Sequence, residues 1–240
     1  MKGTLLNTVA VAVGATLGAL AGSQLPEKYK SFLLAGIGLV AFGLGIKLFL
    51  QSKNIIIVAG AIVLGGAIGM ALGIQEGIES FASWAQSITG GEGRFVEGIV
   101  TASVLFCVGP TTILGCLQDG LEKKIELLAL KSLMDLASSI FLAASMGWGV
   151  LVSALVVLVV QGALTLSARK LAFLASDESM LAELSGTGGV LLMGIGLGLA
   201  DIKFLPTADF LPALFLAPIF VWLGRNFSMR KARQDHAETE

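Results

Sequence analysis

Charged residues are scarce in this chain. They make up 14% of its 240 residues, while 55% are hydrophobic, whereas a typical soluble domain carries about 25% charged residues. The mean hydropathy is +0.87. Composition alone therefore favours an integral membrane protein over a soluble one. The net charge of −1 gives no reason to expect a nucleic-acid partner.

Residues that carry most enzyme chemistry are also few. The only histidine, His236, lies in the polar tail, so we expect neither His-based catalysis nor a His-ligated metal. The two cysteines, Cys107 and Cys116, share one apolar stretch but lie on different helix faces, and we interpret them as small core side chains. No nucleotide-binding loop or catalytic triad is present. We therefore predict neither an enzyme nor a bound cofactor.

Long apolar runs, in contrast, are abundant. A helix needs about 20 mostly apolar residues to cross the hydrocarbon core of a bilayer. The first run ends in Ala19-Leu20-Ala21-Gly22, which resembles a signal-peptide cleavage site, but we expect a retained helix. The sequence therefore predicts an all-α integral membrane protein with about eight transmembrane helices, at 4–22, 31–50, 55–74, 95–117, 125–146, 148–167, 184–201 and 207–225.

The one long connection between these runs covers residues 75–94. Its carboxylates, such as Glu76 and Glu79, fall off the apolar face. This pattern predicts an amphipathic helix on the membrane surface, and a plain polar loop is the alternative. The apolar side chains recur at helical spacing: Ile78, Phe81, Trp84, Ala85 and Ile88.

Lysine and arginine are distributed unevenly over the two sides of this arrangement. With the N-terminus inside, eleven of them lie on the inner side: Lys2, Lys47, Lys53, Lys123, Lys124, Arg169, Lys170, Arg225, Arg230, Lys231 and Arg233. Four lie outside: Lys28, Lys30, Arg94 and Lys203. Because cytoplasmic loops are enriched in Lys and Arg, we predict a multi-pass membrane protein with both termini in the cytoplasm.

A weak internal repeat accompanies the spans. A shift of 95 residues aligns Gly14 with Gly109, and a shift of 180 aligns Gly14 with Gly194. Units with an odd number of spans would form an inverted pair, which is common among secondary transporters; shared composition alone is the alternative. The predicted division is a first three-helix repeat at 1–75, a periplasmic amphipathic linker at 76–94, a second repeat at 95–170, a partial third repeat at 171–226 and a cytoplasmic polar tail at 227–240.

The most informative residue is Asp135, near the middle of the fifth run. A charge at that depth costs about 2.5–3.5 kcal/mol on insertion scales, and such residues usually face a bundle interior. Lys131 lies one turn before it, and Ser138 and Ser139 extend the polar stripe. We predict that Asp135 faces the bundle interior with polar partners. The alternative role is a purely structural ion pair with Lys131.

Other polar residues lie in neighbouring runs. Glu97 and Thr101 begin a second polar stripe in the fourth run, while Asn7 in the first and Gln161 in the sixth are isolated amides. For these two amides we favour an interhelical hydrogen bond, and we retain Asn7 as a candidate site residue.

Two runs contain helix-weakening segments, Gly109-Pro110-Thr111-Thr112 and Ser185–Gly189. Proline removes a backbone donor, glycine lowers helix propensity, and the freed polar groups cannot face lipid. We predict that both segments are non-helical or kinked and adjacent near mid-membrane. Hydroxyl oxygens there would bind a small hard cation, with Asp135 supplying charge and Na⁺ or H⁺ as the coupling ion. The hydroxyls are those of Thr111, Thr112, Ser185 and Thr187.

Three stretches carry a resemblance to a known family: Gly3–Thr8, Phe95–Gly98 through Gly109–Pro110, and Ser185–Val190. Over nearly its whole length the chain resembles the YqgA-like family of bacterial membrane proteins. The resemblance implies a sodium channel or pump and a link to biofilm formation, and it supplies no site residues.

The expected function is therefore transport of an ion or small solute, by a Na⁺- or H⁺-coupled transporter or by a channel. The alternative is a membrane scaffold or sensor that transports nothing and whose Lys131–Asp135 pair is structural. The expected partners are the lipid bilayer and a small ion or solute, and a homo-oligomer is left open.

Overall fold

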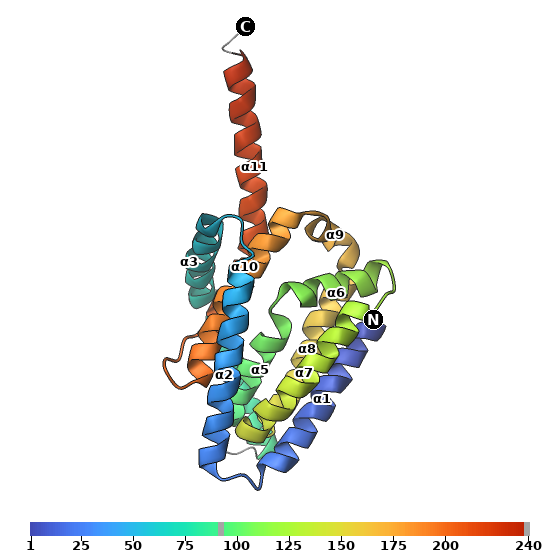
Figure 1. Ribbon diagram of the computed structural model, residues 1–240, viewed down its shortest axis with the longest axis vertical. Helices are drawn as coiled ribbons and strands as arrows, with labels where there is room; N and C mark the ends of the chain where they lie inside the picture. Colours follow the sequence, from blue (N-terminus) through green and yellow to red (C-terminus); the bar gives the residue numbers. More distant parts are fainter. Residues whose placement is uncertain (91–93, 238–240) are drawn as a thin grey trace.

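The computed structural model describes residues 1–90 and 94–237, with side chains up to Arg225 except those of Pro110 and Ala175. All regular structure in these ranges is helical (Figure 1). The elements are α1 (Lys2–Gly22), α2 (Glu27–Phe49), α3 (Ile55–Leu72), α4 (Ile74–Thr89), α5 (Phe95–Cys107), α6 (Pro110–Leu121), α7 (Glu126–Met146), α8 (Gly149–Leu166), α9 (Ala168–Ser176), α10 (Glu178–Leu199), the 3₁₀ helix η1 (Thr207–Phe210) and α11 (Ala213–Ala237).

The helices confirm an all-α membrane protein. Within the described ranges, seven helices are long and apolar enough to cross a membrane, and the number is eight if the bent pair α5–α6 counts as one span. Large apolar side chains such as Phe32, Leu50 and Ile56 are at least three-quarters exposed. An exposed apolar surface of this kind is suited to lipid rather than water. The division into repeats stays a prediction.

Helices α1 and α7 are far apart in sequence but pack side by side and run in the same direction (Figure 1). The contact is made by glycines, because a Cβ atom at Gly18 or Gly22 would overlap the carbonyl oxygen of Ile140 or Ala144. Small residues let helix backbones approach closely in a membrane. This packing holds the polar face of α7 against α1.

Helices α2 and α10 form a second close pair, with opposite directions. A Cβ atom at Gly189 would lie 2.5 Å from the carbonyl oxygen of Gly45, and one at Gly196 would lie 2.6 Å from that of Gly38. The glycines of α10 therefore serve contact with α2 rather than flexibility of α10.

The prediction that Ser185–Gly189 is non-helical or kinked is wrong, because the segment lies inside the continuous helix α10. The helix begins six residues before the expected run, at an N-cap where the Asp177 side chain accepts hydrogen bonds from the N–H groups of Ser179 and Met180. Glycine costs about 1 kcal/mol relative to alanine in a helix, and tertiary packing against α2 offsets that cost.

The other predicted interruption is confirmed. Val108 is extended and Gly109 has φ 135°, a conformation that favours glycine. Helix α6 then starts at Pro110, where a missing N–H is tolerated, and it is bent by 62° from α5. The side chain of Pro110 lies outside the described part. The helices matched to α5–α6 by the proposed repeat, α1 and α10, are both continuous.

A helix in the predicted 75–94 connection is confirmed as α4 over Ile74–Thr89, so the polar-loop alternative is wrong, while its position on the membrane surface stays a prediction. Ala82 and Ala85 pack against Phe95 and Ile99 of α5, while Phe81, Trp84 and Ile88 are exposed. Residues 91–93, at the end of this linker, lie outside the described ranges. The predicted polar tail is helical as far as Ala237 in α11, and residues 238–240 are likewise not described.

Candidate functional site

The polar face of α7 is buried against α1. Asp135 and Lys131 are only 6% and 7% exposed, and the Lys131 ammonium donates to Asp135 Oδ2 at 2.6 Å. Asn7 Nδ2 of α1 donates to the same oxygen at 2.9 Å. The predictions that Asp135 faces the bundle interior and that Asn7 forms an interhelical hydrogen bond are confirmed.

Two buried amide side chains, on α1 and α8, have polar atoms without a partner among the described residues. The buried Asn7 Oδ1 has no hydrogen-bond partner among the described residues, and neither do the two amide atoms of Gln161. Both side chains are 0% exposed. A buried polar group without a partner costs about 1–3 kcal/mol, so such groups need an explanation. The expected interhelical bond of Gln161 is absent from the described part of the chain.

The threonines Thr4 and Thr165 join α1 to α8, with 2.9 Å between their hydroxyl oxygens. Asn7 follows Thr4 by three residues and Gln161 precedes Thr165 by four, so each amide lies one turn from the threonine pair. Since α1 and α8 are antiparallel (Figure 1), the two amides lie at a similar depth.

A carboxylate that the sequence analysis missed lies beyond this threonine pair. Asp119 of α6 is 1% exposed. Its Oδ2 accepts the N–H groups of Gly3 and Thr4, at 3.0 and 3.4 Å, and Oδ1 accepts the amino group of Met1 at 2.8 Å. Backbone N–H groups at a helix start favour a negative charge. Below, the polar cluster means Thr4, Asn7, Asp119, Lys131, Asp135, Gln161 and Thr165.

The serines of the α7 stripe contribute less than expected. Ser139 is buried, but its hydroxyl donates to the Leu136 carbonyl at 2.9 Å, beside Gly14. Ser138 is half-buried. No hydrogen bond joins either hydroxyl to Asp135 within the described structure, and their role as ion ligands stays a prediction.

The segments around Gly109 and Gly188 are adjacent, as predicted, because a Cβ atom at Gly188 would lie 3.8 Å from Gly109 Cα. Their hydroxyls, however, bond locally. Ser185 donates to the Leu181 carbonyl at 2.7 Å and Thr187 to that of Glu183 at 2.8 Å.

The two threonines of the break also differ from the expected arrangement. The Thr112 hydroxyl donates to the Phe106 carbonyl across the break at 3.4 Å, and Thr111 is exposed. The adjacency of the two segments is thus confirmed, whereas a cation site made of their hydroxyls stays a prediction.

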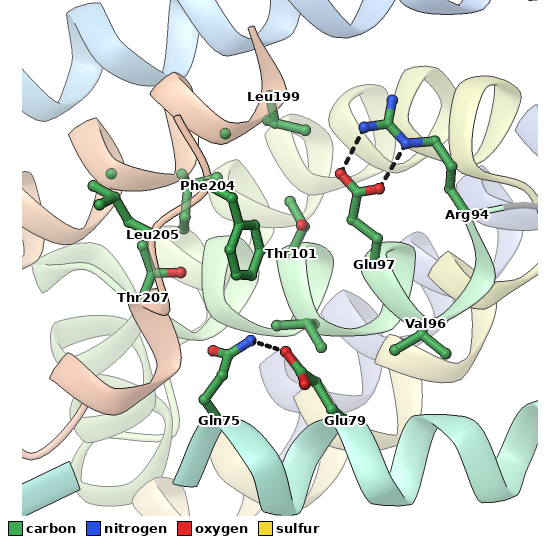
Figure 2. A pocket seen from close by; sticks show the side chains of 14 residues that line it. Gln75, Glu79, Arg94, Val96, Glu97, Thr101, Leu199, Phe204, Leu205 and Thr207 are labelled. Carbon is green, nitrogen blue, oxygen red and sulfur yellow. Dashed lines mark hydrogen bonds and ion pairs between the residues drawn. The ribbon is translucent and has the colours of Figure 1, made fainter. Parts of the chain in front are cut away.

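Glu97 and Thr101 line a cavity that is separate from Asp135. This Glu79 pocket has a volume of about 350 Å³ and lies among α4, α5, α10 and the segment that enters η1 (Figure 2). Asp135 is not among its lining residues. They are Gln75, Glu79, Arg94, Val96, Glu97, Val100, Thr101, Gly194, Ile195, Gly198, Leu199, Phe204, Leu205 and Thr207.

Glu183 of α10 is a further buried carboxylate outside the predicted site. It is 1% exposed, and it accepts the Ser52 hydroxyl at 2.6 Å and the N–H groups of Lys53 and Asn54 at 2.9 and 2.8 Å. These bonds hold the α2–α3 loop. The sequence analysis missed Glu183 because the predicted run began at residue 184; extending the helix back to the Asp177 cap would have included it.

The family model of the DUF554 proteins, described as "Protein of unknown function", matches residues 2–222 of the chain. The uncharacterized protein YqgA of Escherichia coli (strain K12) is 32% identical over 222 residues, which cover 90% of this chain and 94% of the relative. The uncharacterized membrane protein YdfK of Bacillus subtilis (strain 168) is 28% identical over 234 residues, which cover 96% and 100%. No solved structure matches significantly. The resemblance to YqgA-like proteins is confirmed.

Proposed function

The chain belongs to the DUF554 family, and we propose from its own residues that it moves a small ion, or a solute coupled to one, across the membrane. The observation that carries the proposal is the polar cluster, a buried group of polar side chains on four helices of a membrane protein. Ionisable residues inside membrane proteins are rare, usually face the bundle interior, and mark ion and substrate pathways.

The donor-free oxygens of the cluster suit a hard cation. Asp135 Oδ2 accepts hydrogen bonds from both Lys131 and Asn7, while Oδ1 accepts none from the described residues. Asn7 Oδ1 and Gln161 Oε1 are also without donors in that part of the chain. Carboxylate and amide oxygens are ligands of hard cations, not of soft metals. Na⁺ or H⁺ is therefore the proposed ion.

Lys131 has a specific role in this proposal. Its ammonium group neutralises Asp135 while no ion is bound, which limits the cost of a lone buried charge. An arriving cation would compete with that ammonium group for the carboxylate. The net charge at the site would stay constant through a transport cycle if the Lys131 ammonium group released its proton as the cation bound.

The proposed location is the bacterial inner membrane, with both termini in the cytoplasm. The support is the distribution of eleven Lys and Arg residues against four, which follows the positive-inside rule. In this orientation Asp119 lies between the cytoplasmic ends of α1 and α6, and Asn7 and Asp135 lie deeper.

The test is ion flux in proteoliposomes that contain the purified protein, followed with Na⁺- and pH-sensitive dyes. Asp135→Asn should lower the flux about tenfold or more, the effect of losing about 1.4 kcal/mol at a single site. Asp201→Asn is the matched control, because Asp201 is exposed. Equal flux from Asp135→Asn and the control would contradict the proposal.

The scaffold or sensor alternative is favoured by the short ion pair between Lys131 and Asp135. The double variant Lys131→Met/Asp135→Leu separates the two roles. Replacing a buried ion pair with apolar residues is often neutral for stability or stabilising. If the double variant folds and has lost its flux, the pair serves transport; if flux is unchanged, the pair is structural.

A further inference from the structure

The Glu79 pocket contains one carboxylate whose charge is not balanced. Glu97 is paired with Arg94 through two bonds of 2.6 and 2.8 Å, so these charges cancel (Figure 2). Among the described residues, Glu79 accepts a hydrogen bond only from the neutral amide of Gln75, whose Nε2 lies 2.6 Å away. It has no ion pair with any of them. The described lining residues therefore carry a single net negative charge.

A buried hydroxyl faces the same cavity without a partner. Thr207 is 7% exposed, and its methyl group points at Gly194, where a Cβ atom would lie 2.8 Å from Thr207 Cγ2. Figure 2 shows the Thr207 hydroxyl directed into the pocket. It makes no hydrogen bond to any described residue, and the same holds for the Thr101 hydroxyl. Two acceptor oxygens thus face the cavity beside the unbalanced charge.

The remaining lining is apolar and includes one aromatic ring. Phe204, Leu205 and Leu199 cover the cavity beside Thr101 (Figure 2). A volume of about 350 Å³ would hold roughly a dozen water-sized groups at about 30 Å³ each, and it lies in the usual range of small-ligand pockets. Aromatic rings attract cations as well as apolar groups. A bare inorganic ion would leave most of this surface without a partner.

We infer that the Glu79 pocket binds a small monovalent organic cation, a primary ammonium group on a short apolar body. The ammonium group would pair with Glu79 and donate to the hydroxyls of Thr207 and Thr101. The apolar body would lie against Phe204 and the leucines. That this ligand is also the transported solute rests on the proposed function, whereas the binding itself does not.

The test is isothermal titration calorimetry of the purified full chain in detergent. The probes are n-butylammonium, the uncharged 1-butanol of similar shape, and Na⁺. We expect saturable binding of n-butylammonium and at least tenfold weaker binding of 1-butanol and of Na⁺. Failure of n-butylammonium to bind the folded protein, or equal binding of 1-butanol or Na⁺, would overturn the inference.

Variants of the pocket sharpen this test. Glu79→Gln keeps the shape and should weaken n-butylammonium binding at least tenfold, while Glu79→Asp should retain most of it. Glu76→Gln, on the exposed side of the same helix, is the matched control and should bind like the wild type. Thr207→Val should weaken binding severalfold and Thr207→Ser should not. Wild-type binding by Glu79→Gln would overturn the assignment.

Failure of this inference is distinguishable from failure of the proposed function. Equilibrium binding in detergent requires no flux, so Asp135→Asn should bind n-butylammonium like the wild type. Loss of binding in Asp135→Asn, with a folded protein by thermal unfolding, would show that the Glu79 pocket is not an independent site.

Discussion

The helix pairs α1–α7 and α2–α10 are packed by the same means but hold their carboxylates differently. Both pairs depend on glycines that admit a neighbouring backbone, although α1 and α7 are parallel while α2 and α10 are antiparallel. In α1–α7 the carboxylate of Asp135 lies within the pair. In α10 the carboxylate of Glu183 lies near the helix start, against the α2–α3 loop.

The difference lies in how far each carboxylate is satisfied. Glu183 uses both oxygens and accepts three hydrogen bonds from one loop, which is the pattern of a structural anchor. Asp135 uses one oxygen for two donors, and the amide oxygen of its partner Asn7 has no donor among the described residues. Both carboxylates are buried, so the difference between them is how many of their oxygens accept hydrogen bonds. The oxygen of Asp135 that accepts none makes this residue the better candidate for a functional role.

The largest expected effect comes from removing the cation beside Asp135. Lys131→Met leaves an uncompensated buried carboxylate, which should lower the free energy of unfolding by about 3–5 kcal/mol. Chemical denaturation in detergent measures this loss. Lys47→Met, at an exposed position of α2, is the control and should change stability by less than about 0.5 kcal/mol. A small loss for Lys131→Met would mean that Asp135 is not charged in the resting protein.

A smaller effect is expected at the anchor. Glu183→Gln keeps one acceptor oxygen but loses charge-assisted bonds, each worth about 1.5–3 kcal/mol, so unfolding should become easier by about that amount. Hydrogen exchange at Lys53 and Asn54 should accelerate, because their N–H groups then donate to a neutral amide oxygen instead of a carboxylate. Ion flux per folded molecule should be unchanged; a loss comparable to that of Asp135→Asn would end the distinction between the two carboxylates.

Replacing a contact glycine with alanine should lower stability by a similar amount in the α1–α7 and α2–α10 pairs. Gly18→Ala and Gly189→Ala each place a methyl group against a backbone atom of the partner helix, and overpacking of this kind costs about 1–3 kcal/mol. Gly36→Ala and Gly43→Ala meet no atom within 4 Å and should be neutral or slightly stabilising. Thermal unfolding of the four variants provides the measurement. Tolerance in one pair alone would show that only the other requires close approach.

Features set by local sequence could be predicted. The apolar runs locate the spans, and the cost of a charge in the membrane places Asp135 inside the bundle. The break at Gly109 follows from the backbone chemistry of Gly and Pro. In each case the structure follows from the hydrophobicity, charge or backbone preferences of the segment itself.

Features set by distant partners could not be predicted in the same way. The glycines of Ser185–Gly189 indicate a weak helix when read alone, yet their contact with Gly45 and Phe49 makes them an interface. Asp119 and Glu183 bond to backbone groups more than 100 residues away, which no spacing in the chain indicates. Glu97 and Asp135 lie in different sites because contacts between distant helices, which the sequence does not indicate, decide what each side chain faces.

The smallest expected effect concerns the exposed end of α10, where Asp177 pairs with Arg225. Burial alone would raise the pKa of Asp177, but hydrogen bonds from Arg225 and from the backbone N–H groups of Met180 and Ser179 hold the pKa of this carboxyl below its usual value. A lowered folded-state pKa adds stability above the unfolded-state value of about 3.9, and that stability is lost as the pH falls through the folded-state pKa.

Asp177→Asn tests the contribution of the Asp177 charge to stability, because asparagine retains the N-cap and removes only the charge. At pH 7 the variant should be less stable by under about 1 kcal/mol, the usual contribution of an exposed ion pair in water. The gap should narrow as the pH falls below about 3.9 and should shrink at high salt, since exposed charges are screened. Thermal unfolding of both proteins between neutral and acidic pH measures it. A gap that widens on acidification would mean that the carboxyl is stabilised in its protonated form, as a buried carboxyl would be, and would place Asp177 with the interior carboxylates.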